Sequence, residues 1–165
     1  MSTSLNPEAR PAPVPVTLRW TLVFLRTLLG GIFILAGAAK LRDPEFFAFT
    51  LRAFELGIPS GLVPTLAYGI PWLELLCGCL LVTGLVARPA ALVIGAMMLA
   101  FIAGILSLQW RGLDVNCPCF GTLSFVCDGP LGACHLVRNA VFAVVALFVV
   151  SRGASDWRPG TRERS

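Results

Sequence analysis

The sequence predicts an all-α integral membrane protein: a four-helix bundle with an amphipathic helix on the membrane surface and a cysteine-rich loop outside the membrane. Two observations predict this class. Hydrophobic residues make up 56% of the 165 residues and charged residues only 13%, and the mean hydropathy of +0.81 is far above that of a soluble domain. Four apolar runs are also each about 20 residues long, which at ~1.5 Å per residue covers the ~30 Å hydrocarbon layer. A lipid bilayer is therefore the expected environment.

The four spans are expected within one membrane domain, residues 18–151. They are Trp20–Ala39, Leu66–Val86, Ala90–Leu108 and a last helix from Pro130 to about Ser151. Asp128 is the expected N-cap of the last helix, with Pro130 in its first turn. Gly95 and Gly104 permit close helix contact in the third span.

The remaining segments are not expected to cross the membrane. Glu45–Leu56 contains four phenylalanines among charged residues and is too short and too charged to span, which predicts an amphipathic helix on the membrane surface after the first span. Residues 1–17 are polar and rich in proline, and we expect a disordered tail there. Residues 152–165 form a second polar tail.

The basic residues predict the orientation of the bundle. Four spans place both tails on one side, and that side carries the larger number of basic residues. The tail side has Arg10, Arg19, Arg88, Arg152, Arg158, Arg162 and Arg164, and the other side has Lys40, Arg42, Arg52 and Arg111. The positive-inside rule therefore predicts cytoplasmic tails in a bacterial inner membrane and a periplasmic loop between spans three and four. No basic patch is interleaved with aromatic residues, so nucleic acid is not an expected partner.

Four of the six cysteines gather in the periplasmic loop and at the start of the last helix: Cys117, Cys119, Cys127 and Cys134. Outside the inner membrane such thiols can be oxidised. Cys117-Pro118-Cys119 is too tight for a relaxed disulfide, and a strained one would be labile. Cys134 falls in the first turns of a helix, where the helix dipole favours a thiolate, and Arg138 shares its face. These features predict redox-active cysteines, with Cys134 as the partner of the Cys117/Cys119 pair.

Other interpretations of the cysteines stay open. Two structural disulfides would simply pin the loop, and four cysteines allow three pairings among which the sequence does not choose. A metal site is not expected because the spacing lacks Cys-x-x-Cys knuckles, although His135 would complete a shell; we expect His135 to be a polar residue at the helix start, at the membrane interface. Cys77 and Cys79 lie on nearly opposite faces of the second span, so they cannot pair and are expected to pack as small buried hydrophobes.

Ionisable residues inside the spans need partners, because an unpaired charge there costs ~2.5–3.5 kcal/mol on insertion scales. Glu74 lies roughly two turns inside the second span, with Arg138 and Lys40 at compatible depth. Arg26 enters from the other side and reaches them only if its helix tilts or breaks. We expect either a contact from Glu74 to Arg138, with Asn139 as a hydrogen-bonding neighbour, or a neutral, purely structural Glu74.

An ordered set of motifs resembles a known family. The motifs are Arg26–Phe33, Ala36–Pro44, Pro71-Trp72-Leu73-Glu74, Cys117-Pro118-Cys119-Phe120-Gly121 and Arg138-Asn139. Over about Val16 to Val150 this set resembles the MauE branch of the DoxX-like membrane proteins. The resemblance implies a four-helix inner-membrane protein associated with periplasmic redox chemistry. It also implies a link to methylamine use, through maturation of the disulfide-rich small subunit of methylamine dehydrogenase with a thioredoxin-like partner.

The resemblance also carries over to particular residues. The Cys-x-Cys-Phe-Gly motif of the family matches Cys117 and Cys119, and its polar membrane residues match Glu74, Arg138 and Asn139. Cys127 and Cys134 are not part of that pattern, so a local elaboration of the loop is the alternative to a shared mechanism.

Residues and resemblance together predict thiol–disulfide exchange with a thioredoxin-like periplasmic protein, in support of a secreted client enzyme; the chain would be one component of a thiol–disulfide oxidoreductase. A thiolate of Cys134 or Cys119 would attack a partner disulfide, and the neighbouring cysteine would resolve the intermediate. Two alternatives stay open. One is a non-catalytic membrane chaperone or scaffold with structural disulfides, and the other is a quinone-linked DoxX-type oxidoreductase subunit with a quinone among the helices near Glu74.

Overall fold

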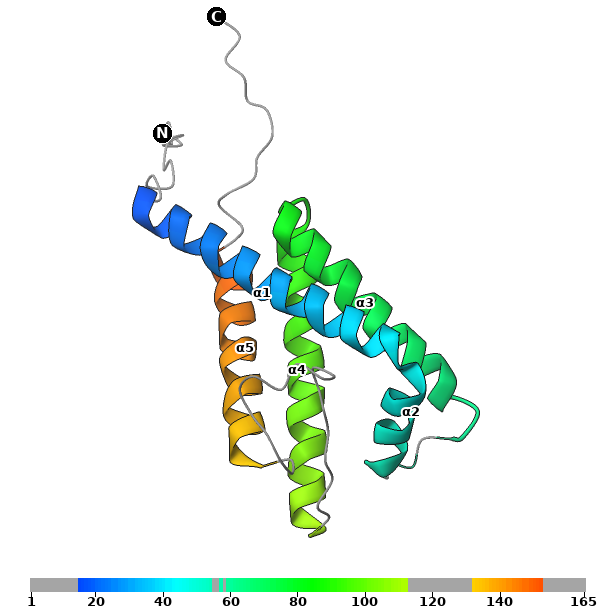
Figure 1. Cartoon of the computed structure of the whole chain (residues 1–165). Coiled ribbons are helices and arrows are strands. Elements are labelled where there is room, and N and C mark those ends of the chain that lie inside the picture. The colour runs from blue at the N-terminus through cyan, green and yellow to red at the C-terminus, as the bar shows by residue number, and fades with distance from the viewer. Residues whose placement is uncertain (1–14, 55–56, 58, 113–131, 153–165) are drawn as a thin grey trace, which may run out of the picture.

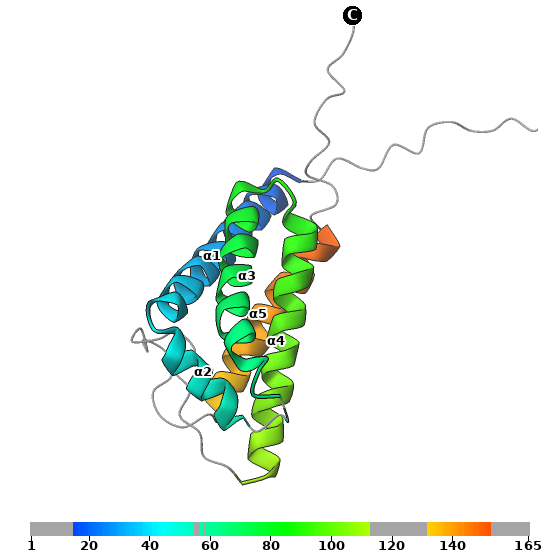
Figure 2. The same ribbon diagram turned by 90° about the vertical axis from the view of Figure 1, so that its right-hand side faces the viewer.

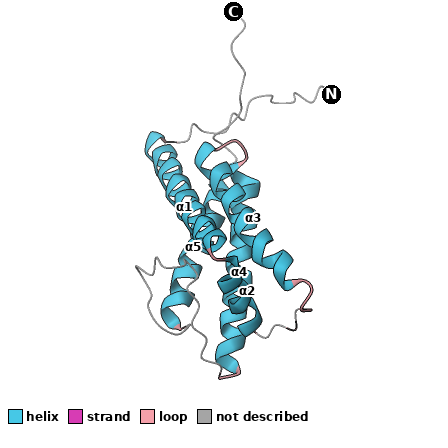
Figure 3. Cartoon of the chain, turned by 45° about the vertical axis from the view of Figure 1, so that its right-hand side comes forward, coloured by secondary structure: helices cyan, strands magenta, loops and turns pink. Residues whose placement is uncertain are grey.

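The computed structural model describes residues 15–54, 57, 59–112 and 132–152, and this part of the chain is helical without strands (Figure 3). Its helices are α1 (Val16–Arg42), α2 (Pro44–Ala53), α3 (Val63–Thr83), α4 (Ala87–Trp110) and α5 (Ala133–Arg152). All except the ten-residue α2 are long and apolar enough to cross a membrane. The four predicted spans are therefore found, in the predicted order.

The ends of the helices differ from the predicted ends for local reasons. α3 stops at Thr83 rather than Val86, because Gly84 takes a left-handed conformation (φ 76°) and its N–H donates to the carbonyl of Leu80 at 2.9 Å. α5 begins at Ala133, so the predicted start at Pro130 is wrong. The carbonyl of Gly132 accepts the first hydrogen bonds of α5, from His135 at 3.1 Å and Leu136 at 3.2 Å. The expected cap, Asp128, lies outside the described residues.

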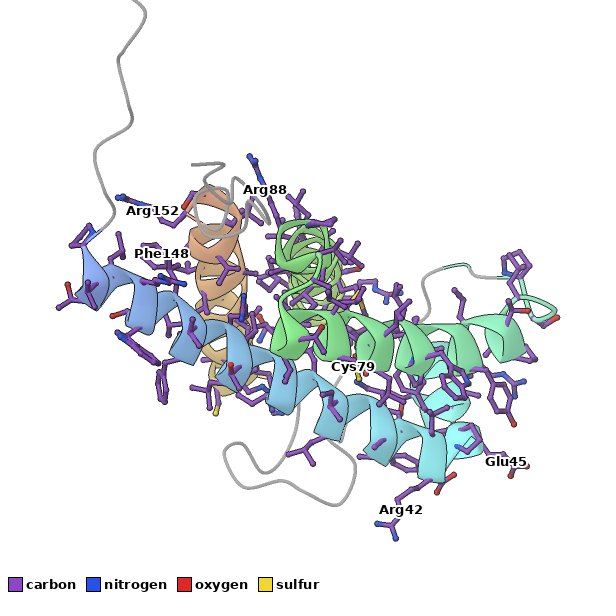
Figure 4. All side chains as sticks on the ribbon, turned by 90° about the horizontal axis from the view of Figure 1, so that it is seen from above. Arg42, Glu45, Cys79, Arg88, Phe148 and Arg152 are labelled. Carbon is purple, nitrogen blue, oxygen red and sulfur yellow. The ribbon has the colours of Figure 1, made fainter. Side chains whose placement is uncertain are left out.

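The four long helices form a bundle in which each one packs against two neighbours. Around the bundle the order is α1, α3, α4, α5 and back to α1. The α1–α3 and α4–α5 contacts are the most extensive. In Figure 1, α1 and α3 run obliquely across the α4–α5 pair, and Figure 2 shows α3 beside α4. Figure 4 shows the same division, with α4 and α5 seen nearly end-on while α1 and α3 lie side by side. Consequently α3 and α5 face each other across the centre of the bundle.

The two ends of the bundle carry different connections. The start of α1, the α3–α4 turn and the end of α5 lie at one end, which we call the tail end (Figure 1). Arg88 at the start of α4 and Arg152 at the end of α5 lie at this end. The α1–α2 corner, the start of α3, the end of α4 and the start of α5 lie at the other end, which we call the loop end. This arrangement agrees with the predicted sidedness of the chain, while the cytoplasmic location of the tail end stays a prediction.

Glycines set the distance between α1 and α3. A Cβ on Gly30 would stand 2.7 Å from the carbonyl oxygen of Gly78, and a Cβ on Gly37 would stand 2.7 Å from the carbonyl oxygen of Pro71. These are distances at which only a glycine fits, so the two helices touch backbone to backbone, as small residues allow between membrane helices. The opposite pair, α4 and α5, instead packs through side chains such as Ile94 and Val149 in the main hydrophobic core.

The short helix α2 is folded back onto the loop end of the bundle. It begins with Asp43, whose side chain accepts a hydrogen bond from the backbone N–H of Phe46 at 3.0 Å, and a proline follows at the first helical position. Phe47 packs on α3 and Phe54 packs on α4. Arg111 at the end of α4 donates to the carbonyl of Phe54 at 2.6 Å. The helix predicted at 45–56 thus exists over Pro44–Ala53, and its position on a membrane surface stays a prediction.

Candidate functional site

A buried ion pair lies inside the bundle. The ammonium of Lys40 on α1 donates to both carboxylate oxygens of Glu74 on α3, at 2.6 and 2.7 Å. The two side chains are only 5% and 1% exposed, and Glu74 stands about half-way along α3. An isolated charge at this depth would be costly, so the ion pair explains how two ionisable residues can lie inside an apolar bundle.

The packing of α1 on α3 explains why Lys40 is the partner of Glu74. Gly37 and Pro71 bring the two antiparallel backbones together at one level. Helical side chains lean toward the N-terminus of their own helix, so Lys40 reaches back toward Gly37, and Glu74 reaches back toward Pro71. The two charged groups therefore meet beside one of the close backbone contacts between α1 and α3.

Aromatic rings surround the ammonium of Lys40. Its Nζ lies 5.5 Å from the ring centre of Phe47 on α2 and 5.9 Å from that of Phe101 on α4. A cation over an aromatic face is attracted by the ring quadrupole, more strongly where water is excluded. The short helix α2 therefore contributes to the centre of the bundle as well as to its surface.

Next to the ion pair lies a small cavity of about 20 Å³. All four long helices line it, with Phe33, Ala36 and Lys40 from α1, Glu74 from α3, Met98 and Phe101 from α4, and Arg138, Asn139 and Phe142 from α5. Phe33 and Phe142 meet edge to face, with ring centres 6.3 Å apart. We call this cavity and its four polar side chains, Lys40, Glu74, Arg138 and Asn139, the polar centre.

The structure brings together most of the intramembrane residues that the sequence singled out. The sequence predicted a contact from Glu74 to Arg138, but the ion-pair partner of Glu74 in the structure is Lys40, the other cation placed at compatible depth. Arg138 and Asn139 line the same cavity from α5, and Asn139 is buried, with 5% exposure. The aromatic residues Phe47 and Phe101 are additions that hydropathy does not reveal, because nothing distinguishes them from other apolar residues in the same runs.

Arg26 does not join the polar centre. Its guanidinium lies against Gly84, the residue that ends α3 at the tail end of the bundle. Gly84 leaves room for this group because it has no side chain. A positive charge near the last carbonyls of a helix is favourable. Arg26 therefore connects α1 to the end of α3 and lies away from Glu74, which stands about half-way along that helix.

The cysteines fall into two groups. Cys134 is the second residue of α5 and is exposed at the loop end; it is disulfide-bonded. Cys117, Cys119 and Cys127 lie outside the described residues. Within α3, Cys77 and Cys79 are both free, as predicted. Cys77 is buried in the core, but Cys79 is exposed, so the expectation that both are buried is wrong for Cys79.

His135 is the third residue of α5, at the helix start as predicted. Its side chain is buried, with 3% exposure, and its Nδ1 has no hydrogen-bond partner among the described residues. No group of three metal-binding side chains occurs in the part of the chain that the structure describes. Because three loop cysteines lie outside it, the expected lack of a metal stays a prediction.

These features define a class of protein: a multi-pass helical membrane protein whose four spans enclose a charged centre. The chain belongs to the MauE family, because the family described as methylamine utilisation protein MauE matches residues 18–152. It is also 29% identical over 128 residues to the methylamine utilization protein MauE of Paracoccus denitrificans, a match that covers 77% of this chain and 67% of that protein. No solved structure gives a significant match. The resemblance to MauE found in the motifs is thereby confirmed.

Proposed function

We propose that this protein supports thiol–disulfide exchange at the periplasmic face of the bacterial inner membrane, and thereby the maturation of a secreted enzyme of methylamine utilisation. Membership of the MauE family carries the proposal, and the relative from Paracoccus denitrificans is named for methylamine utilization. The expected partners are a thioredoxin-like periplasmic protein and the client enzyme.

The position of Cys134 supports the exchange chemistry. The residue is exposed in the first turn of α5, where the unpaired backbone N–H groups stabilise a thiolate. Arg138 follows one turn later on the same helix face and lines the polar centre. A thiol at this point is accessible from outside the bundle, and its disulfide in the structure is the form that a reduced partner would attack.

The exchange proceeds in two steps. A thiolate of Cys134 or Cys119 attacks one sulfur of the partner disulfide, which forms a mixed disulfide and releases the other partner sulfur as a thiolate. A neighbouring cysteine of the loop, Cys117 or Cys127, then attacks the mixed disulfide as its thiolate. This second step leaves a disulfide in this chain and two thiols on the partner. The reverse sequence would oxidise the partner.

A quinone among the helices near Glu74 stays the alternative to exchange by the cysteines alone. Bound quinone in the purified protein would support it, and we assign no step to a quinone here.

Thiol trapping on native membranes tests the proposal. The sample is quenched in acid, free thiols are tagged with a maleimide, and the tags on Cys117, Cys119, Cys127 and Cys134 are mapped by mass spectrometry. We expect a mixture of oxidised and reduced forms that shifts when a reduced thioredoxin-like protein is added. Complete oxidation that such a protein does not change would contradict exchange and leave a scaffold with structural disulfides.

Two substitutions separate exchange from a scaffold. Cys117→Ser should abolish the shift while the amount of protein in the membrane stays normal, whereas loss of the protein itself would indicate a structural staple. Cys79→Ser is the matched control, because Cys79 is a free and exposed thiol on α3 and should leave both the shift and the protein level unchanged.

A further inference from the structure

The polar centre lies where two helices of the bundle face each other without packing together closely. α3 contacts α1 and α4, and α5 contacts α4 and α1, so α3 and α5 are diagonal partners. The cavity of about 20 Å³ lies between them. A site that holds one water needs roughly 10–15 Å³ measured for a water-sized probe, and two to four polar neighbours. The cavity therefore has the size of a single water.

The lining of the cavity supplies the polar neighbours. Asn139 on α5 is 5% exposed, and a buried amide requires hydrogen-bond partners. Glu74 on α3 accepts one hydrogen bond at each oxygen from Lys40, which leaves further lone pairs of the carboxylate for another donor. Phe33, Met98 and Phe142 are apolar residues of the lining. Cavities that stay empty of water are lined by apolar groups alone, whereas this cavity also has polar groups in its lining.

We propose that the cavity is a binding site for one water molecule, hydrogen-bonded to the carboxylate of Glu74 on α3 and to the amide of Asn139 on α5. The water joins the two diagonal helices, which have no extensive direct contact. Water both donates and accepts hydrogen bonds, so this molecule could also exchange a proton with the carboxylate of Glu74, which lies about half-way along α3. This site does not depend on the proposed exchange chemistry.

Hydroxyl-radical footprinting of the full chain in lipid nanodiscs tests the site. Ionising pulses convert bound water into radicals that oxidise the nearest reactive side chains. Met98 lines the cavity and is 5% exposed, so bulk water does not reach it. The next residue, Met97, is not part of the lining and is the internal reference. We expect oxidation of Met98 to exceed that of Met97, and equal or weaker oxidation of Met98 would overturn the proposal.

Two variants show whether the water occupies this cavity. Asn139→Leu removes the amide, and oxidation of Met98 should then be lost while that of Met97 is unchanged. Ala36→Val fills the cavity from α1 without removing a polar group, and it should have the same effect if Asn139→Leu does not fold. Persistent oxidation of Met98 in the folded variants would mean that its water lies elsewhere, which also contradicts the proposal.

Discussion

The two main helix pairs of this bundle are held together in different ways. α1 and α3 meet through their backbones, with Gly30 facing Gly78 and Gly37 facing Pro71. α4 and α5 meet through side chains, and at Gly95 an added Cβ would stand 3.7 Å from the Cβ of Ala146, an ordinary contact distance. The α1–α3 pair is thus held at the close distance that only glycine allows, whereas side chains set the distance between α4 and α5.

This difference explains where the ion pair lies. Lys40 and Glu74 come from the two helices whose spacing is fixed by glycine, and both hydrogen bonds between them are short. Arg138 and Asn139 come from α5, which packs on α4 through side chains, and they border the cavity instead. We therefore expect the charged contact to depend on the close approach of the two backbones, and the following substitutions test that dependence.

Glu74→Gln should have the largest effect. It leaves the ammonium of Lys40 buried without a counter-charge, and breaking a buried pair costs about 3–5 kcal/mol of the free energy of unfolding. The measurement is unfolding of the purified protein in mixed micelles with increasing denaturing detergent. Glu45→Gln, at an exposed carboxylate of α2, is the control and should change stability by less than about 1 kcal/mol.

A double substitution shows whether the loss comes from the unpaired charge. Lys40→Met with Glu74→Met replaces both charges by apolar groups of similar length, and such replacements of a buried pair are often neutral. Most of the lost stability should therefore return. If the double variant were as unstable as Glu74→Gln, the loss of stability in Glu74→Gln would not come from the unpaired charge of Lys40.

Gly30→Ala should have the next largest effect. The new methyl group meets the carbonyl oxygen of Gly78 at 2.7 Å, which forces the two backbones apart, and overpacking of this kind costs about 1–3 kcal/mol. The same unfolding assay measures it. Gly31→Ala is the matched control on the same helix, because nothing lies within 4 Å of its added Cβ. Equal stability of the two variants would show that α1 and α3 do not meet backbone to backbone.

Gly84→Ala tests the tail end of the same helix pair. Gly84 has a φ of 76°, and alanine in this left-handed region costs about 1–2 kcal/mol. The added methyl group would also collide with the guanidinium of Arg26. Gly112→Ala is the control, since Gly112 has a φ of 67° and open space around it. Gly84→Ala should lower the midpoint of unfolding more than Gly112→Ala, and the difference should vanish in an Arg26→Ala background.

The sequence predicted the spans better than the centre that they enclose. Length and hydropathy identify four crossings, because both are properties of single segments. The partner of Glu74 depends on which helices are neighbours, and the depth of a residue along its own helix does not reveal this. By depth alone, Lys40 and Arg138 could both have reached Glu74. Likewise, Gly95 and Gly104 were the glycines expected to permit close helix contact, but the backbone contacts form between Gly30 and Gly78 and between Gly37 and Pro71.

Gly95→Ala should have the smallest effect, and in the opposite direction. Its added Cβ meets Ala146 at an ordinary distance, and alanine is favoured over glycine inside a helix by up to about 1 kcal/mol. Stability in the unfolding assay should therefore be unchanged or slightly raised, whereas Gly30→Ala lowers it. A loss at Gly95 as large as that at Gly30 would mean that α4 and α5 are also fixed by a glycine contact, and the distinction between the two pairs would not hold. The opposite signs of two identical substitutions would instead show that close backbone approach is confined to the pair that carries the ion pair.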